Sequence, residues 1–232
     1  MAEYLGATAP RRRSIIQAAR FPKRSVVARY DKARECLVDF LVDGTRSLNH
    51  MARAIDNLEK REARPGVTSW IKQDCRFSIE AIQSFERSYN RIGLAPIMCE
   101  AINGRLPPLV IGPTKISVAL DAITRKRNGN GPDSIGGVFL LFSRGEGTGK
   151  QRIERCKTVA GIAYEYCAAM LASRGAADTS ICFGVDVFGG RAYQPQGTFA
   201  RKRRQIEDSC DEIAASWKLV KPPSDYDGPD PH

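Results

Sequence analysis

Residues 106–187 contain four short apolar runs: LVIG at 109–112, KISVALDAITR at 115–125, IGGVFLLFS at 135–143 and SICFGVDV at 180–187. Apolar residues alternate with small or polar ones over 116–121, which is typical of a half-buried strand. The continuous apolar run at 138–142 favours a strand that is buried on both faces. Residues 150–173 have apolar side chains at helical spacing. The segment therefore predicts three strands, a helix and a fourth strand.

The residues on either side of this segment are predicted to be mainly helical. Apolar side chains recur every three or four positions upstream, with a break at Asp43-Gly44, and a short strand is predicted downstream at 191–194. The predicted helices are 31–62, 68–91, 96–102 and about 199–217. We therefore expect an α/β or α+β fold. An N-terminal helical layer precedes a mixed sheet of four or five strands, which is flanked by the helices at 150–173 and 199–217.

Four segments follow one another along the chain: a basic arm at 1–30, a helical region at 31–104, an α/β core at 105–220 and a disordered tail at 221–232. The arm has seven basic side chains against one acid, and its prolines limit it to a short helix at 14–19. The arm either binds phosphates or is a solvated terminus. The tail has four prolines and three aspartates, a composition that favours disorder.

The composition indicates a folded, basic protein. Hydrophobic residues make up 42% of the 232 residues, which is enough for a sizeable core. Lys and Arg number 36 against 26 Asp and Glu, so the formal net charge is +10. That balance favours polyanionic partners such as nucleic acid, or an anionic membrane surface. The alternative is a basic but inert surface.

A cytoplasmic location is expected because no apolar run approaches the ~20 residues that span a bilayer and residues 1–10 are too polar for a signal peptide. No membrane partner is expected. The seven cysteines are widely spread and form no C-x-x-C pair, and the only histidines are His50 and His232. Structural zinc and iron–sulfur sites need closer ligands, so we expect reduced, mostly buried thiols.

The first candidate site is a glycine-rich loop, Gly145-Glu146-Gly147-Thr148-Gly149-Lys150, between the strand at 135–143 and the following helix. A P-loop has this setting, and an apolar strand that ends at Asp186 would supply its magnesium ligand. Two features depart from the P-loop pattern. Only three residues separate Gly145 from Gly149-Lys150, whereas the P-loop pattern has four between its first glycine and the Gly-Lys pair. Gln151 stands where the pattern has the Ser or Thr that binds magnesium. The alternative is a basic turn without a ligand.

The second candidate site is centred on Asp121, at the end of the alternating run Ser117-Val118-Ala119-Leu120-Asp121. The order helix, three strands, helix, strand resembles the PD-(D/E)XK nuclease superfamily. That resemblance implies a magnesium-dependent nuclease in which Asp121 is a catalytic metal ligand. The family's Glu-x-Lys is missing from the third strand, and only Glu146 and Lys150 beyond it offer such groups. The resemblance therefore implies either a degenerate site or migrated ligands. Otherwise Asp121 is a strand-end residue that pairs with Arg125 or another base.

The third candidate is a nucleic-acid surface made of three basic clusters, with further cations at the start of the helix at 150–173. No helix-turn-helix, zinc-finger or RRM signature is present, so recognition would use the phosphate backbone. The alternative is a set of separate solvated faces. The predicted nucleic-acid-binding residues are Arg11, Arg12, Arg13, Arg125, Lys126, Arg127, Arg201, Lys202, Arg203 and Arg204.

The sequence thus predicts a DNA- or RNA-associated binding or scaffold subunit with a degenerate nuclease-like core and no cofactor. Two alternatives stay open. One is an active nuclease that uses Mg²⁺ at Asp121, and the other is a subunit that binds only proteins.

Overall fold

The structure is a computed structural model that describes residues 1–232 except 23–28, 130, 145–148, 196–199, 227 and 229–232. The chain forms two compact units, each assembled from separate segments. Unit 1 comprises Met1–Val27, Pro107–Val118 and Gly197–His232, and unit 2 comprises Ala28–Leu106 and Ala119–Gln196. Residues 105–220 are therefore divided between the two units.

Unit 2 contains a six-stranded mixed sheet, which confirms the expected α/β architecture. Its strands are β1 (Met98–Glu100), β4 (Ala122–Lys126), β5 (Ser134–Leu141), β6 (Ala176–Ala177), β7 (Phe183–Asp186) and β8 (Arg191–Tyr193). The strand order is β1-β4-β5-β7-β8, and β6 pairs with β5. β5 and β7 are parallel and are connected through α6 (Gly149–Met170), whereas β4 is antiparallel to β1 and β5.

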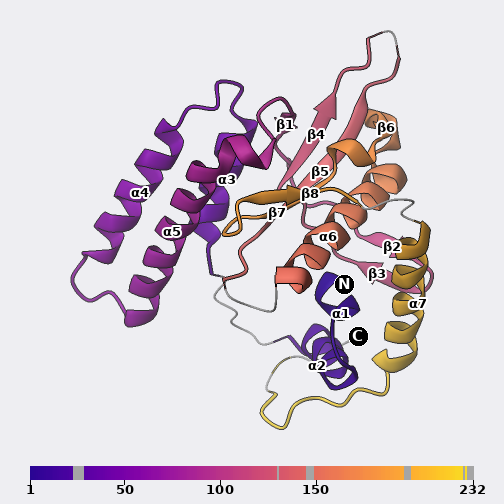
Figure 1. The fold of residues 1–232 in the computed structure, drawn as a ribbon. Helices are drawn as coiled ribbons and strands as arrows, with labels where there is room; N and C mark the ends of the chain where they lie inside the picture. The colour runs from indigo at the N-terminus through magenta and orange to yellow at the C-terminus, as the bar shows by residue number, and fades with distance from the viewer. Residues whose placement is uncertain (23–28, 130, 145–148, 196–199, 227, 229–232) are drawn as a thin grey trace. The chain divides into compact units, whose positions relative to one another are not determined.

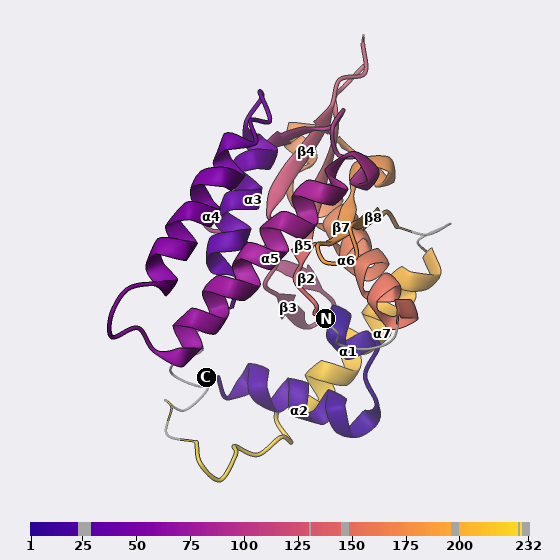
Figure 2. The same ribbon diagram turned by 60° about the vertical axis from the view of Figure 1, so that its left-hand side comes forward.

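Helices cover both faces of this sheet (Figures 1 and 2). α3 (Asp31–Val42), α4 (Asn49–Glu62) and α5 (Ser69–Ile92) share a core with β5 and β7 on one face, which confirms the predicted helical layer. α6 lies on the other face. It packs closely because Gly137 and Gly184 have no side chains there, so Gly184 lies against the main chain of Cys156.

Local signals explain where these helices begin and end. The Thr68 hydroxyl accepts a hydrogen bond from the Ile71 N–H and caps α5, which ends at Gly93 in the left-handed conformation with φ +77°. Asp43 ends α3, and its carboxylate accepts hydrogen bonds from the Thr45 and Ser47 N–H groups, so the predicted break at Asp43-Gly44 is confirmed. Two short 3₁₀ turns, η1 (Ala172–Arg174) and η2 (Thr179–Ile181), precede β6 and β7 respectively.

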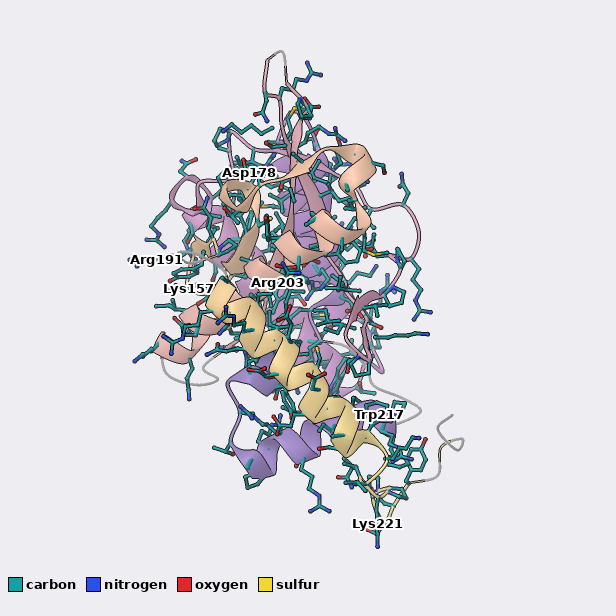
Figure 3. All side chains as sticks on the ribbon, turned by 90° about the vertical axis from the view of Figure 1, so that its right-hand side faces the viewer. Lys157, Asp178, Arg191, Arg203, Trp217 and Lys221 are labelled. Carbon is teal, nitrogen blue, oxygen red and sulfur yellow. The ribbon has the colours of Figure 1, made fainter. Side chains whose placement is uncertain are left out.

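Unit 1 is built from α1 (Ala2–Leu5), α2 (Ala9–Arg20), α7 (Ala200–Trp217) and a hairpin of β2 (Leu109–Ile111) and β3 (Thr114–Ile116). Tyr4, Ile16, Phe21 and Val220 form its small core. The Thr114 hydroxyl donates to the Cys210 carbonyl oxygen at 2.8 Å, which ties the hairpin to α7. Figure 3 shows Arg203 near one end of α7, and Trp217 and Lys221 toward the other.

Two predictions about the strands are wrong. The run at 115–125 forms β3 and β4 rather than one strand, because the chain crosses from unit 1 to unit 2 within it. The segment predicted as a helix at 96–102 contains β1, because Met98–Glu100 pairs with β4. The strand at 109–112 therefore belongs to the hairpin of unit 1, and β1 is the strand that lies beside β4. In both places long-range pairing outweighs the local pattern.

The two ends of the chain contact each other in unit 1. α2 is longer than the helix expected at 14–19, and its Gln17 amide donates to the Lys221 carbonyl oxygen at 2.8 Å. The Tyr226 ring lies edge-on to Phe21 at a centroid distance of 5.1 Å. These contacts involve the described part of the predicted tail. Disorder of the remaining tail residues stays a prediction.

All seven cysteines are free thiols, and all but the partly exposed Cys99 are buried, as expected. Burial raises the pKa of Cys36, Cys156 and Cys167 to about 12. These side chains are therefore neutral at physiological pH and serve as small apolar residues. Among the described residues, no helix is both long enough and apolar enough to cross a bilayer.

Candidate anion-binding edge of the sheet

One edge of the sheet in unit 2 brings several charged side chains together. The parallel strands β5 and β7 both end there, and β4, which is antiparallel to β5, begins there with Asp121 just before it. We call this the carboxyl edge. It comprises the ends of β5 and β7, Asp121, the first turns of α6, and the parts of α3 and α5 that contact these residues. Ligands of α/β sheets commonly bind at the carboxyl ends of the strands.

Asp121 is buried, and each of its carboxylate oxygens accepts a hydrogen bond from the protein. Arg34 of α3 donates from Nη1 to Asp121 Oδ1 at 2.5 Å, and the Leu140 N–H donates to Oδ2 at 2.6 Å. Arg34 Nη2 also donates to the Leu140 carbonyl oxygen at 3.2 Å. Burial raises the pKa of the Asp121 carboxyl, although Arg34 and the Leu140 N–H favour its charged form. The partner that the sequence suggested, Arg125, is engaged elsewhere.

Asp186, at the end of β7, is held in a similar way. Arg152 of α6 donates to its Oδ2 from Nε at 3.1 Å and from Nη2 at 2.6 Å. The Gly189 N–H donates to Oδ1 at 2.9 Å, and the tight turn ends at Gly190 with φ +61°. This carboxylate therefore fixes both the turn after β7 and the start of α6.

These acids do not have the surroundings of a magnesium site. Asp121 pairs with Arg34 of α3 and Asp186 with Arg152 of α6, so the two carboxylates turn toward opposite helical layers. Each carboxylate oxygen of Asp121 and Asp186 already accepts a hydrogen bond from an N–H group of the protein. Glu146 lies outside the described residues. The described residues contain no group of three or more His, Cys, Asp or Glu side chains that would hold a metal ion.

Three aromatic rings lie nearly parallel at the carboxyl edge, and we call them the aromatic column: Phe142, Tyr30 and Phe77. Phe142 and Tyr30 have centroids 5.2 Å apart and an interplanar angle of 17°. Tyr30 and Phe77 are 6.5 Å apart at 21°. Phe188, two residues after the end of β7, lies edge-on to Tyr30 at a centroid distance of 5.8 Å. The column is therefore also in contact with the segment that follows β7.

Arginines lie over both ends of the aromatic column. The Arg34 guanidinium carbon is 5.0 Å from the centre of the Phe142 ring, and that of Arg144 is 4.4 Å from the centre of Phe77. Arg29 lies 5.8 Å from the same Phe77 ring. Stacking on an aromatic face orients a guanidinium group without using its N–H donors. The column therefore brings three arginines against ring faces at one edge.

Tyr30 is held in a strained backbone conformation to join this column. It is the N-cap residue of α3 and has φ 66° and ψ 13°, a region that large side chains rarely occupy. Its N–H donates to Asp74 Oδ1 of α5 at 3.0 Å, which offsets part of that cost. Burial raises the pKa of the Tyr30 hydroxyl, so the ring is neutral. Strain of this kind is often found at functional positions.

The start of α6 adds positive charge where a helix normally avoids it. Its first turn contains no acidic residue but includes the exposed Lys150, and Arg152 and Arg155 follow. The Arg155 guanidinium donates to the Ser143 hydroxyl at 3.1 Å, next to the end of β5. The positive end of the helix dipole repels these cations, so an anion at this position would be stabilised by both the dipole and the side chains.

The predicted basic residues of unit 2 outside this edge are partly neutralised. Arg125 donates to Glu100 at 2.6 Å and to Asp133 at 3.3 Å, and Arg174 also binds Glu100, at 2.5 Å. This network lies where β4 ends and β5 begins, which we call the amino edge. Lys126 and Arg127 follow on the exposed hairpin.

The predicted basic residues of unit 1 lie on two helices. On α2, Arg11 pairs with Glu3 at 2.5 Å and Arg12 with Glu212 at 3.0 Å, while Arg13 is exposed. On α7, Arg203 pairs with Glu207 at 3.2 Å. Arg201 and Arg204 are exposed and Lys202 is half-buried. The clusters at 125–127 and 201–204 belong to different units.

The structure brings Arg29, Arg34 and Arg144 to the carboxyl edge. None of them is among the predicted binding residues, although Arg29 belongs to the predicted basic arm. Arg34 is a single basic residue within a helix, and no local pattern distinguishes it from a solvated side chain. Only its contacts with Asp121 and Phe142, which are distant in the sequence, place the Arg34 side chain at the carboxyl edge. The chain matches no protein-family model, no curated protein and no solved structure.

Proposed function

We propose that the protein binds the phosphate backbone of nucleic acid at the carboxyl edge and leaves the strand intact. The observation that carries this proposal is the arginine-capped aromatic column beside the cationic start of α6. Guanidinium groups suit phosphate oxygens, which accept two parallel hydrogen bonds from one arginine. A repeating polyanion can engage several of these cations together.

The charge balance of the whole chain supports a polyanionic partner. Unit 1 contains 13 basic against 8 acidic side chains, and unit 2 contains 23 against 18. The excess is therefore shared by both units and is not confined to the N-terminal arm. Such an excess attracts nucleic acid over long distances and makes binding depend on salt.

The proposal that the strand stays intact rests on the state of the acids. The resemblance to PD-(D/E)XK nucleases implies a metal at Asp121, but Asp121 and Asp186 are neutralised by Arg34 and Arg152. β5, in the place of the family's third strand, has neither an acid nor a lysine. The arrangement supports a degenerate nuclease-like core that retains a charged edge.

The direct test measures binding of labelled DNA and RNA, single- and double-stranded, of about 20 nucleotides. Each is titrated at NaCl concentrations from about 50 to about 300 mM, with and without Mg²⁺. We expect binding that weakens steeply with salt and intact strands in every sample. No binding at the lowest salt would contradict the proposal. Magnesium-dependent cleavage that is lost in Asp121→Ala would show an active nuclease instead.

A pair of variants locates the contact. Arg29→Ala combined with Lys150→Ala should weaken binding about 10- to 100-fold and lower the slope of log K against log salt by about 2. The matched control is Arg53→Ala combined with Arg87→Ala, which removes two exposed cations from α4 and α5 outside the carboxyl edge. Equal losses in the two double variants would show that binding is not localised at this edge.

A further inference from the structure

Arg34 is held at the carboxyl edge by three kinds of contact. Its guanidinium donates to Asp121 Oδ1 and to the Leu140 carbonyl oxygen, and it lies 5.0 Å from the centre of the Phe142 ring. A carboxylate, a main-chain carbonyl and an aromatic face thus determine its plane. An exposed arginine without such partners samples many rotamers, and fixing it on binding costs conformational entropy.

The two members of this ion pair differ in their access to solvent. The Arg34 side chain is 43% exposed, whereas that of Asp121 is 4% exposed. A guanidinium group has five N–H donors, and the two named contacts use only one from each of two nitrogens. The arginine therefore has donors left for a ligand at the edge, and the aspartate lies behind it.

We propose that Arg34 contacts a phosphate of the bound strand directly, and that Asp121 is the positioning residue that holds its guanidinium. This inference rests on the proposed function and assigns a contact within it. Asp121, which the resemblance to PD-(D/E)XK nucleases implies to be a metal ligand, then serves phosphate binding without a metal. Its buried carboxylate orients Arg34, as a carboxylate behind a metal-bound histidine orients the ring.

The orientation has a specific chemical consequence. A lysine at position 34 would keep the charge and an ion pair with Asp121, but it would lose the planar pair of donors that matches two phosphate oxygens. The number of positive charges at the edge, and hence the salt dependence of binding, would be unchanged. Charge and geometry are therefore separable at this position.

The test uses the full chain and a labelled single strand of about 20 nucleotides. The variants are Arg34→Lys, Arg34→Gln, Asp121→Asn and the double variant Arg34→Gln with Asp121→Asn. The double variant removes both charges together, so it keeps the site neutral if Arg34→Gln alone fails to fold. Circular dichroism and the urea midpoint establish folding before any affinity is compared.

We expect Arg34→Gln to weaken binding about 10-fold and to lower the salt slope by about 1. Arg34→Lys should weaken binding about threefold with an unchanged slope, because only the paired geometry is lost. Asp121→Asn should weaken binding by less than Arg34→Gln does. It should have no further effect in the Arg34→Gln background, a coupling that a merely structural role would not produce.

Other outcomes overturn the inference. If the wild-type chain binds and Arg34→Gln, or the double variant, binds equally well, Arg34 does not touch phosphate, although the proposed function stands. If Asp121→Asn weakens binding equally in the wild-type and Arg34→Gln backgrounds, Asp121 acts independently. If Mg²⁺ strengthens wild-type binding and this gain is lost in Asp121→Asn, Asp121 is a metal ligand. Failure of the wild-type chain to bind at low salt overturns the proposed function and this inference together.

Discussion

The two edges of the sheet in unit 2 are both rich in arginine, but they use it differently. At the amino edge, Arg125 and Arg174 share Glu100, and Arg125 also reaches Asp133, so acids surround the cations. At the carboxyl edge, Arg34, Arg144 and Arg152 also pair with acids. Arg34 and Arg144 in addition stack on aromatic rings, and the exposed Lys150 opens α6 without an acidic neighbour in the first turn. Ion pairs alone therefore do not distinguish the two edges, which differ in the aromatic support of the arginines and in the exposed cation at a helix start.

The largest effect should follow from breaking the ion pair between α6 and β7. Arg152→Ala leaves the Asp186 carboxylate, whose side chain is 9% exposed, without its cation. We expect a loss of about 3 kcal/mol in the free energy of unfolding, because an unpaired buried charge is costly. Urea denaturation measures this loss. Asp186→Asn in the same background should recover part of it, and no recovery would mean that the cost is lost packing.

A smaller effect should follow from the same change at the amino edge. Arg125→Ala removes one cation from a half-exposed network, so we expect a loss of about 1–2 kcal/mol in unfolding free energy. Nucleic-acid affinity at constant salt should change less than twofold, since the Arg125 side chain is only 20% exposed and is bound by both Glu100 and Asp133. A 10-fold loss of affinity would remove the distinction between the two edges.

A substitution in the aromatic column tests the carboxyl edge without altering its charge. Phe77→Leu keeps an apolar side chain but removes the ring beneath Arg144 and Arg29. We expect a loss of about 1 kcal/mol in stability and an affinity loss of about threefold, since each cation–π contact contributes about 0.5–1 kcal/mol at exposed sites. The salt slope should stay constant. A Phe85→Leu variant, whose ring lies in the core of the helical layer, should lower stability but not affinity at salt concentrations where it is folded.

The smallest expected effect is a dependence of stability on pH. Burial raises the pKa of Asp121 above its ordinary value of 3.8, so the folded state holds this proton more tightly than the unfolded state. Its contribution to stability is therefore greatest below pH 3.8 and falls as pH rises through the folded pKa. Asp121→Asn should thus gain stability relative to wild type as pH rises. Urea midpoints across this range test the sign, and a relative loss would contradict a raised pKa.

Much of the helical structure could be predicted because its signals are local. The break at Asp43-Gly44, the capping Thr68 and the stop at Gly93 all lie next to the residues that they control. Strands were harder to predict, because the pairing of Met98–Glu100 with β4 depends on residues about 25 positions away. The predicted helix at 96–102 and the undivided strand at 115–125 failed for this reason.

The candidate site could be predicted only in part. Asp121 was predicted from the resemblance in element order to PD-(D/E)XK nucleases, and Lys150 from the P-loop-like glycine sequence before the helix at 150–173. The sequence provided no sign of Arg34 or of the ring column, since Phe142, Tyr30 and Phe77 come from three different parts of the chain. Their common location depends on how α3 and α5 pack against β5.

The sequence by itself determined the class of fold, the buried thiols and the excess of positive charge. Each of these follows from composition or from a period of two or about four residues, which a short window of the chain contains. Only the tertiary structure decided which cations are neutralised and which acid faces which arginine. Those pairings join residues as far apart as Arg34 and Asp121, and they exist only where the packing of helices on the sheet brings the two charges within hydrogen-bonding distance.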